Sequence, residues 1–271
     1  MNYDKFQIII SFTIYFIVSF IFSTNLSSEI KLNEPALIYK VRGDHYRRIG
    51  LFSEALNEYD KALTIKKDFP ECYYWSAIIY KKKGLYSQAM YEIKSTLKYL
   101  KKLWLNDPAL KRKQLYYDTL FLEVEVLLLN KDSHETNWTG IIIEKIDKMI
   151  AELKDVRNKL GGEFKFYLKY RLGRAYFYRG ILEIIKELGE SYKGEINISN
   201  LWKLTTNQIN KIVGHFKKSA TFQYKSDVSY YYQYLLYKVN QNKKNAKHSF
   251  EKALELNPNI ENDYQKHVYE E

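Results

Sequence analysis

Two neighbouring segments of the chain align with each other at a constant offset of 34 residues; they cover residues 36–69 and 70–103. The matched positions are aromatic or small, namely Tyr39 with Tyr73, Tyr46 with Tyr80, Gly50 with Gly84 and Ala55 with Ala89. Repetition at this period is typical of stacked supersecondary units, each of which buries its apolar face against the next. The spacing therefore predicts a repeat architecture.

The pattern inside one unit predicts two helices joined by a tight turn. Tyr39, Gly43 and Tyr46 follow the i, i+4, i+7 spacing that places side chains on one helix face. Gly50 then interrupts the helix, and Ser53 stands where we expect the N-cap of the second helix. The lack of a side chain at Gly43 predicts a close approach between the two helices.

The composition excludes most other fold classes. The 271 residues include only 11 Gly and 4 Pro, too few for a hairpin-rich β fold, and a single cysteine, Cys72, which excludes a disulfide framework. Because 46% of the residues are hydrophobic, the chain can bury a large core. We therefore predict an all-α solenoid of helical hairpins.

The repeated residues carry a family resemblance. Residues 36–69 and the distant segment 227–260 resemble tetratricopeptide repeats. The residues that match the family pattern are Tyr39, Gly43, Tyr46, Ala55, Tyr59 and Ala62 in the first segment, and Tyr230, Tyr237, Ala246, Phe250, Ala253 and Pro258 in the second. The resemblance implies a right-handed superhelix and a non-enzymatic role in binding other proteins.

The remaining sequence fits the same plan less closely. Residues 166–226 resemble a repeat that is split by an insertion at 186–206, and residues 104–165 supply two helical stretches that we interpret as a degenerate pair. The last stretch, 260–271, reads as a polar capping helix. These boundaries place the solenoid over residues 29–271.

The amino terminus has the pattern of an export segment. Lys5 precedes an apolar run at residues 6–22, and a short polar stretch follows to residue 28. Residues 1–28 therefore predict a cleaved signal peptide, with an uncleaved membrane anchor and a buried helix of the fold as alternatives. Both favoured interpretations place the rest of the chain outside the cytoplasm, as a periplasmic, envelope-associated or secreted protein.

The sequence contains no recognisable catalytic constellation. The five histidines share no spacing, and the glycine pair Gly189 and Gly194 lacks the Lys and Ser or Thr of a phosphate-binding loop. We therefore predict no enzymatic activity, no catalytic or metal-binding residues, and no cofactor.

The charge pattern indicates a binding surface. Lys and Arg total 43 against 32 Asp and Glu, a net charge of +11. The resemblance implies that one side of each first helix faces a concave groove. The residues expected there are mostly cationic or aromatic: Lys40, Arg47, Arg48, Tyr74, Lys81, Lys82, Tyr170, Arg174, Tyr178, Tyr231 and Lys238. Such a surface suits a protein partner or an extended acidic peptide, with Arg48 and Arg174 as the expected anchors.

Three alternatives to this hypothesis remain. A solvated basic face without a ligand has the same composition. A binder of polyanions, such as acidic glycans, anionic lipids or nucleic acid, also fits the net charge, although export disfavours nucleic acid. An enzyme built from the 186–206 insertion is the least favoured, because that segment offers no nucleophile and base. The pattern indicates neither the identity of the partner nor an oligomeric state.

Overall fold

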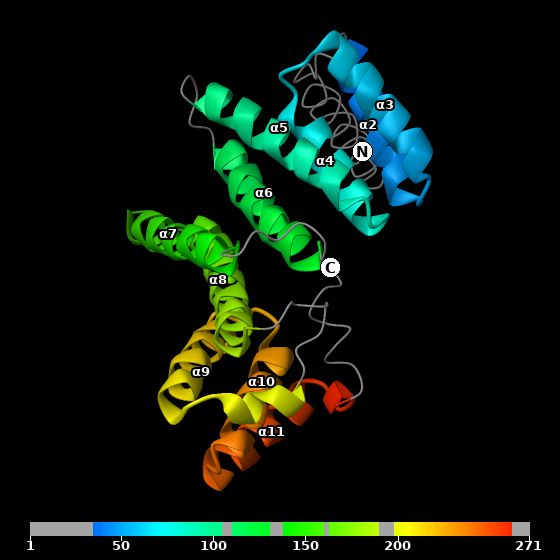
Figure 1. Ribbon diagram of the computed structural model, residues 1–271. Helices are drawn as coiled ribbons and strands as arrows, with labels where there is room; N and C mark the ends of the chain where they lie inside the picture. The colour runs from blue at the N-terminus through cyan, green and yellow to red at the C-terminus, as the bar shows by residue number, and fades with distance from the viewer. Residues whose placement is uncertain (1–34, 105–109, 131–137, 160–162, 190–197, 262–271) are drawn as a thin grey trace, which may run out of the picture. The chain divides into compact units, whose positions relative to one another are not determined.

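The computed structural model describes residues 35–104, 110–130, 138–159, 163–189 and 198–261 (Figure 1). Within these ranges the chain forms ten α-helices and one 3₁₀ helix, with no strand. The elements are α2 (Pro35–Arg48), α3 (Phe52–Ile65), α4 (Pro70–Lys82), α5 (Tyr86–Trp104), α6 (Leu110–Leu129), α7 (Trp138–Lys159), α8 (Glu163–Leu188), η1 (Ile198–Lys203), α9 (Thr206–Thr221), α10 (Ser226–Val239) and α11 (Lys243–Leu256). The all-α prediction is confirmed for these residues. The export segment 1–28 and residues 262–271 of the predicted cap lie outside the described ranges.

The chain divides into two compact units, Met1–Ile79 and Tyr80–Glu271. In the first, unit 1, α2 packs along α3. The core of unit 1 is a cluster of fully buried side chains: Ala55, Tyr59, Ala62, Cys72 and Ile79. A Cβ atom added to Gly43 would lie 2.6 Å from the Tyr59 ring, so the glycine permits the close approach predicted from the sequence.

The 34-residue register appears in the backbone of the two turns. Gly50 has φ of 81° and Gly84 has φ of 71°, a left-handed conformation that glycine adopts without steric cost. In both turns the next residue donates its N–H to a carbonyl five positions earlier, at 2.9 Å, which is the bond pattern that closes a helix before a glycine. The expected N-cap is wrong by two residues: Leu51 occupies that position without a side-chain bond, and Ser53 lies inside α3.

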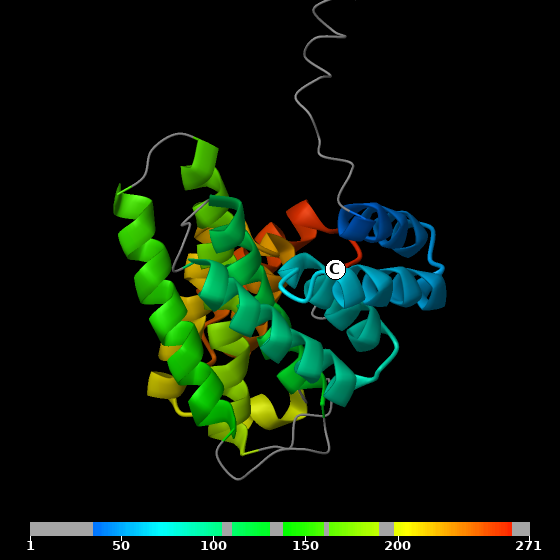
Figure 2. The same cartoon turned by 90° about the horizontal axis from the view of Figure 1, so that it is seen from above.

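Unit 2 is a succession of helices in which neighbours along the chain pack together. Contacts join α5 with α6, α7 with α8, α8 with α9, α9 with α10, and α10 with α11. Figures 1 and 2 both show α7 and α8 running side by side. The segment interpreted as a degenerate pair therefore supplies α6 and α7, which pack on α5 and on α8 respectively.

The helix α8 is the centre of unit 2. Every residue from Leu172 to Ile185 is buried, so this part of the helix has no solvent-exposed face. Two glycines of α8 contact the aromatic core. A Cβ atom added at Gly173 would lie 2.6 Å from the Cβ atom of Tyr224, and a Cβ atom added at Gly180 would lie 2.9 Å from the Phe216 ring. Phe216 in turn stacks on Tyr232 of α10, with ring centroids 4.9 Å apart.

Two parts of the insertion predicted at 186–206 lie within the described residues, 186–189 and 198–206. α8 continues to Leu188, and η1 packs against both α8 and α10. Leu201 is fully buried and Leu204 is nearly so, whereas Trp202 between them is 69% exposed. Thr205 then starts α9 through a capping box with Gln208. The insertion therefore adds a covering element to the core of unit 2.

Candidate functional site

Unit 1 presents a group of polar and aromatic side chains along one side of α2. Lys40 and Asp44 form an ion pair of 2.6 Å between Nζ and Oδ2. The hydroxyl of Tyr59 donates to Asp44 Oδ1 at 2.8 Å from the core behind them. Burial of this hydroxyl and the adjacent Asp44 carboxylate raise the pKa of Tyr59 well above its ordinary value, so it remains a hydrogen-bond donor.

Arg47 extends this group onto α4. Its guanidinium lies 3.7 Å from the centre of the Trp75 ring, a cation–π geometry, and its Nε donates to the Tyr59 hydroxyl at 3.3 Å. The Tyr74 ring meets Trp75 edge-on, with centroids 5.0 Å apart. Within the described part of the chain, the terminal Nη nitrogens of Arg47 have no hydrogen-bond partner. We call the set Lys40, Asp44, Arg47, Tyr74 and Trp75 the Arg47–Trp75 face.

The Arg47–Trp75 face has the chemistry of a carboxylate site. A guanidinium that rests on an aromatic ring is oriented, and its two Nη nitrogens match the two oxygens of a carboxylate. The half-buried rings of Tyr74 and Trp75 offer flat apolar surface beside this charge. Arg48, the expected anchor, is exposed, and its Nε donates to the Asp44 carbonyl at 3.2 Å.

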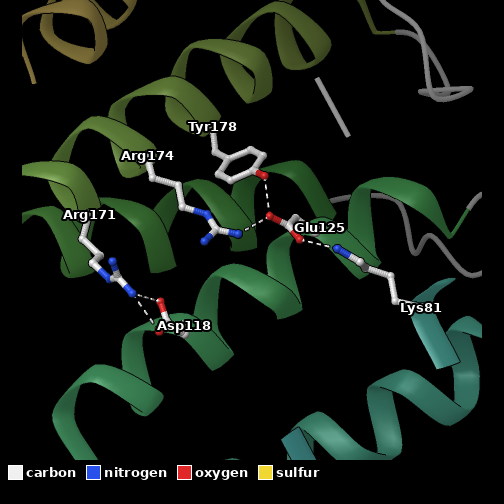
Figure 3. Close-up of polar contacts among 6 residues, drawn as sticks. All are labelled: Lys81, Asp118, Glu125, Arg171, Arg174 and Tyr178. Carbon is white, nitrogen blue, oxygen red and sulfur yellow. Dashed lines mark hydrogen bonds and ion pairs between the residues drawn. The ribbon is translucent and has the colours of Figure 1, made fainter. Parts of the chain in front are cut away.

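In unit 2 three of the predicted groove residues converge on a carboxylate of the protein itself. Glu125 of α6 lies between α4 and α8 (Figure 3). Its Oε2 accepts from Lys81 Nζ at 2.7 Å, and its Oε1 accepts from Arg174 and, at 2.5 Å, from the Tyr178 hydroxyl. The network therefore links three helices through one buried side chain.

The environment of Glu125 fixes its charge. Burial by itself would raise the pKa of this carboxyl, but the positive charges of Arg174 and Lys81 and the hydrogen bonds from Lys81 and Tyr178 outweigh it and lower the pKa to about 2. Glu125 is therefore ionised at neutral pH. The same carboxylate and burial raise the pKa of the Tyr178 phenol well above its usual range.

A second ion pair, between Arg171 of α8 and Asp118 of α6, lies about one helical turn from Arg174 along α8. Nη2 of Arg171 contacts both carboxylate oxygens of Asp118, at 2.6 and 2.8 Å (Figure 3). The same guanidinium lies 3.6 Å from the centre of the Tyr167 ring. Farther along α8, Arg179 bonds to Asp147 at 2.9 Å and to the fully buried Glu183. The three arginines of α8 are thus neutralised within the fold.

This arrangement corrects part of the predicted groove. Arg174 is 9% exposed, Tyr178 2% and Tyr231 6%, so these three side chains belong to the interior and cannot anchor a ligand on this surface. For Arg174 and Tyr178 the physical reason is that Glu125 occupies the position that a ligand carboxylate would take, whereas Tyr231 packs in the hydrophobic core of unit 2. Lys81 is held in the same network.

The other predicted residues remain at the surface. Tyr170 is 37% exposed and meets Tyr224 edge-on, while Lys82 and Lys238 are exposed. Lys238 donates to the hydroxyl of Tyr234 at 3.1 Å. Of the predicted set, the structure brings Lys40, Arg47 and Tyr74 together with Trp75 in unit 1, and it brings Lys81, Arg174 and Tyr178 together around Glu125 in unit 2.

Sequence reasoning missed Trp75, Asp118 and Glu125. Trp75 occupies a position at which the first repeat has Val41, so the alignment drew no attention to it. Glu125 stands in a nearly continuous apolar stretch, and an acid in such a helix requires a buried cationic partner. An acidic residue within an apolar helix was therefore the signal in the sequence, although this signal does not identify the cationic partner.

The described residues contain no cluster of His, Cys, Asp and Glu that could hold a metal ion. Among the helices that the structure describes, none combines the length and apolarity needed to cross a bilayer. The apolar run 6–22 lies outside those residues.

The fold and the two sets of contacts define a class of protein, an array of α-helical hairpins with a cationic and aromatic surface. Two family profiles match the sequence: TPR repeat over residues 43–84, and tetratricopeptide repeat over residues 235–260. The chain therefore contains tetratricopeptide repeats (TPR) in these two segments.

Solved structures agree with the fold. The crystal structure of YrrB, a TPR protein with an unusual peptide-binding site, is similar with a TM-score of 0.50 and 14% identity, covering 88% of this chain and 93% of that one. Yeast Tom70 has 16% identity over 84% of this chain and 57% of its own, with a TM-score of 0.24, which is too low to support an argument. No curated protein matches the sequence.

Proposed function

We propose that this protein is a non-enzymatic scaffold that binds a protein or an extended acidic peptide on the Arg47–Trp75 face. The observation that carries the proposal is the Arg47 guanidinium, oriented on the Trp75 ring at 3.7 Å with its Nη nitrogens available to a carboxylate. TPR proteins and the peptide-binding neighbour YrrB support this class of partner.

The pairing of the cations favours the Arg47–Trp75 face over α8 as the location of the site. Lys81 and the three arginines of α8 pair with acidic side chains, namely Asp118, Glu125, Asp147 and Glu183. On the Arg47–Trp75 face, by contrast, the one acid of α2, Asp44, pairs with Lys40, and the Nη nitrogens of Arg47 remain available. An acidic peptide would therefore gain more from contact with the Arg47–Trp75 face than from contact with the arginines of α8.

We further propose that the protein works outside the cytoplasm, held in or released from the membrane by residues 6–22. The cationic start, the apolar run and the polar exit of the sequence support this location. Amino-terminal sequencing of the native protein tests it. A first residue within about positions 24–29 indicates cleavage, whereas intact protein in the cytosol would contradict export.

The binding proposal is tested by site-specific cross-linking. A photoreactive residue replaces Tyr74, or, as the control, Tyr91, which is 68% exposed on α5. Both proteins are irradiated in envelope extracts. We expect a discrete adduct from position 74 alone, and equal adducts from both positions would show unspecific contact.

A charge substitution then tests the anchor with the partner so identified. Arg47→Gln removes the guanidinium, and a charge-assisted hydrogen bond contributes about 1.5–3 kcal/mol, so binding should weaken by roughly 10- to 150-fold. Lys243→Gln at the exposed start of α11 removes the same charge as a control. Equal losses in the two variants would contradict a specific site and favour diffuse attraction.

A polyanion ligand is the second candidate, and the net charge of +11 favours it. The two candidates differ in salt dependence. Binding to a polyanion loses affinity linearly on a log–log plot with a steep slope, because counterions are released. A shallow slope of this plot, on the order of what one or two neutralised charges produce, supports the peptide site.

A further inference from the structure

The outer side of α2 carries an apolar stripe that faces away from the Arg47–Trp75 face. At 3.6 residues per turn, Ile38, Val41 and His45 fall on one side of α2, and Ile49, one residue beyond its end, continues the line. Lys40 and Arg47 fall on the opposite side. We call Ile38, Val41, His45 and Ile49 the outer stripe.

The outer stripe is unusually open to solvent. Ile38 is 36% exposed, Val41 48% and Ile49 55%. Single exposed apolar residues are common, but three in line along one helix form a continuous surface. Such a surface is typical of a helix face that packs on a partner.

The 34-residue register indicates what fits there. The positions that follow Ile38 and His45 by one repeat are Cys72 and Ile79, and both are fully buried in the cluster they form with α3. In the second repeat this side of the first helix therefore packs on the preceding helical hairpin. On α2, the first described helix, the same side has no preceding hairpin among the described residues. We therefore expect a helix to pack there, as the preceding hairpin does in the second repeat.

Charge indicates which helix fits. Arg42 and Arg48 border the outer stripe on its two sides, and both are exposed. A second copy of this chain would bring its own arginines against them, and such like-charge contacts oppose association. A helix with acidic residues beside its apolar positions would instead pair with both arginines.

We propose that the outer stripe is a docking site for an acidic amphipathic helix of another protein. Its apolar residues pack on Ile38, Val41 and Ile49, and its acidic residues pair with Arg42 and Arg48. An antiparallel helix places its first turn near Arg48, where acidic residues also favour the helix dipole. This surface is separate from the Arg47–Trp75 face.

The test uses two synthetic helical peptides and the full chain. Both peptides carry Leu at the i, i+3, i+7 and i+11 positions; one has Glu at the flanking positions and the other has Lys. Binding is measured by fluorescence anisotropy. We expect the Glu peptide to bind and the Lys peptide to bind at least about tenfold more weakly.

Variants locate the contact. Val41→Asp should weaken binding of the Glu peptide by about tenfold or more, while Ile65→Asp should leave it unchanged, since Ile65 is equally exposed (51%) on α3 of the same unit. Circular dichroism establishes that both variants keep their helicity. Arg47→Gln should also leave binding of the Glu peptide unchanged. This variant shows that the result does not depend on whether the Arg47–Trp75 face binds a peptide.

Three outcomes would overturn the proposal. The first is that neither peptide binds the full chain, and the second is equal affinity for both peptides. The third is a dimer in analytical ultracentrifugation that Val41→Asp alone dissociates, because the stripe would then belong to a second copy.

Discussion

A methyl group added at Gly173 provides a sharp test of the packing in unit 2. The new Cβ would lie 2.6 Å from Cβ of Tyr224, 3.0 Å from Cβ of Phe222 and 3.3 Å from the Phe222 carbonyl oxygen. Two of these atoms are bound directly to the backbone and the third belongs to it, so a rotation of side chains cannot relieve the clash. Gly214 of α9 is the matched control, because a Cβ there has nothing within 4 Å.

The two substitutions differ only in this contact. Replacing a helical glycine by alanine stabilises a protein by about 0.5–1 kcal/mol through the entropy of the backbone. Overpacking of a core costs about 1–3 kcal/mol. Gly214→Ala should therefore raise the free energy of unfolding of unit 2 by about 0.5–1 kcal/mol. The free energy of unfolding of the Gly173→Ala variant should be about 1–3 kcal/mol lower than that of the Gly214→Ala variant.

Thermal and urea unfolding followed by circular dichroism measure this difference. At the length of unit 2, each kcal/mol changes the melting temperature by about 2–4 °C, so the two variants should differ by roughly 2–12 °C. Equal stabilisation by both substitutions would refute the close contact between α8 and the segment that connects α9 with α10. Equal destabilisation would show that the control position is also packed.

Three further predictions concern ionisable groups. Because the pKa of Glu125 falls from 4.5 to about 2 on folding, its contribution to stability is complete above pH 4.5 and is lost as the pH falls toward 2. Glu125→Gln should lower the free energy of unfolding at pH 7 by about 3–5 kcal/mol, because Lys81 and Arg174 lose their counter-charge. In urea titrations the variant should also lose less stability than the original protein as the pH falls toward 2. Burial, helped by Arg179 and Lys218, lowers the pKa of His215 from 6.5 to about 4, so stability should decline as the pH falls through that interval, and His215→Asn should remove the decline. In NMR titrations the ring of His215 should remain neutral at pH 6, and a midpoint near 6.5 would contradict its burial.

The local elements of the fold could be predicted because they depend on neighbours in sequence. Each repeat has a glycine in a left-handed turn and a small residue at a helix contact, and both recur after 34 residues. Two aligned repeats are therefore enough to predict the positions of both features. Ala55 and Ala89, matched by that register, are both fully buried. The missed cap at Ser53 reflects a turn that closes through backbone bonds and needs no side chain.

The candidate site could be predicted only in part, because its chemistry depends on distant partners. Arg174 and Glu125 are 49 residues apart, and Glu125 stands in a helix without the repeat signature. The register predicted Arg174 on the first helix of the split repeat, and Arg174 lies on α8. It carried no information on whether an acid of a neighbouring helix would neutralise it, so buried and available cations had the same pattern in the sequence.

The enclosure of α8 has a consequence for how unit 2 loses its structure. In an ideal repeat array each unit touches only its neighbours, so the ends can fray while the middle remains folded. Here one 14-residue stretch, Leu172–Ile185, is covered on every side, and η1 contacts α8 and α10 together. Deleting α10 and α11 would therefore uncover the central helix as well as shorten the array. We expect unit 2 to unfold in a single cooperative step, and truncation from its carboxyl end to abolish folding instead of reducing stability by one repeat.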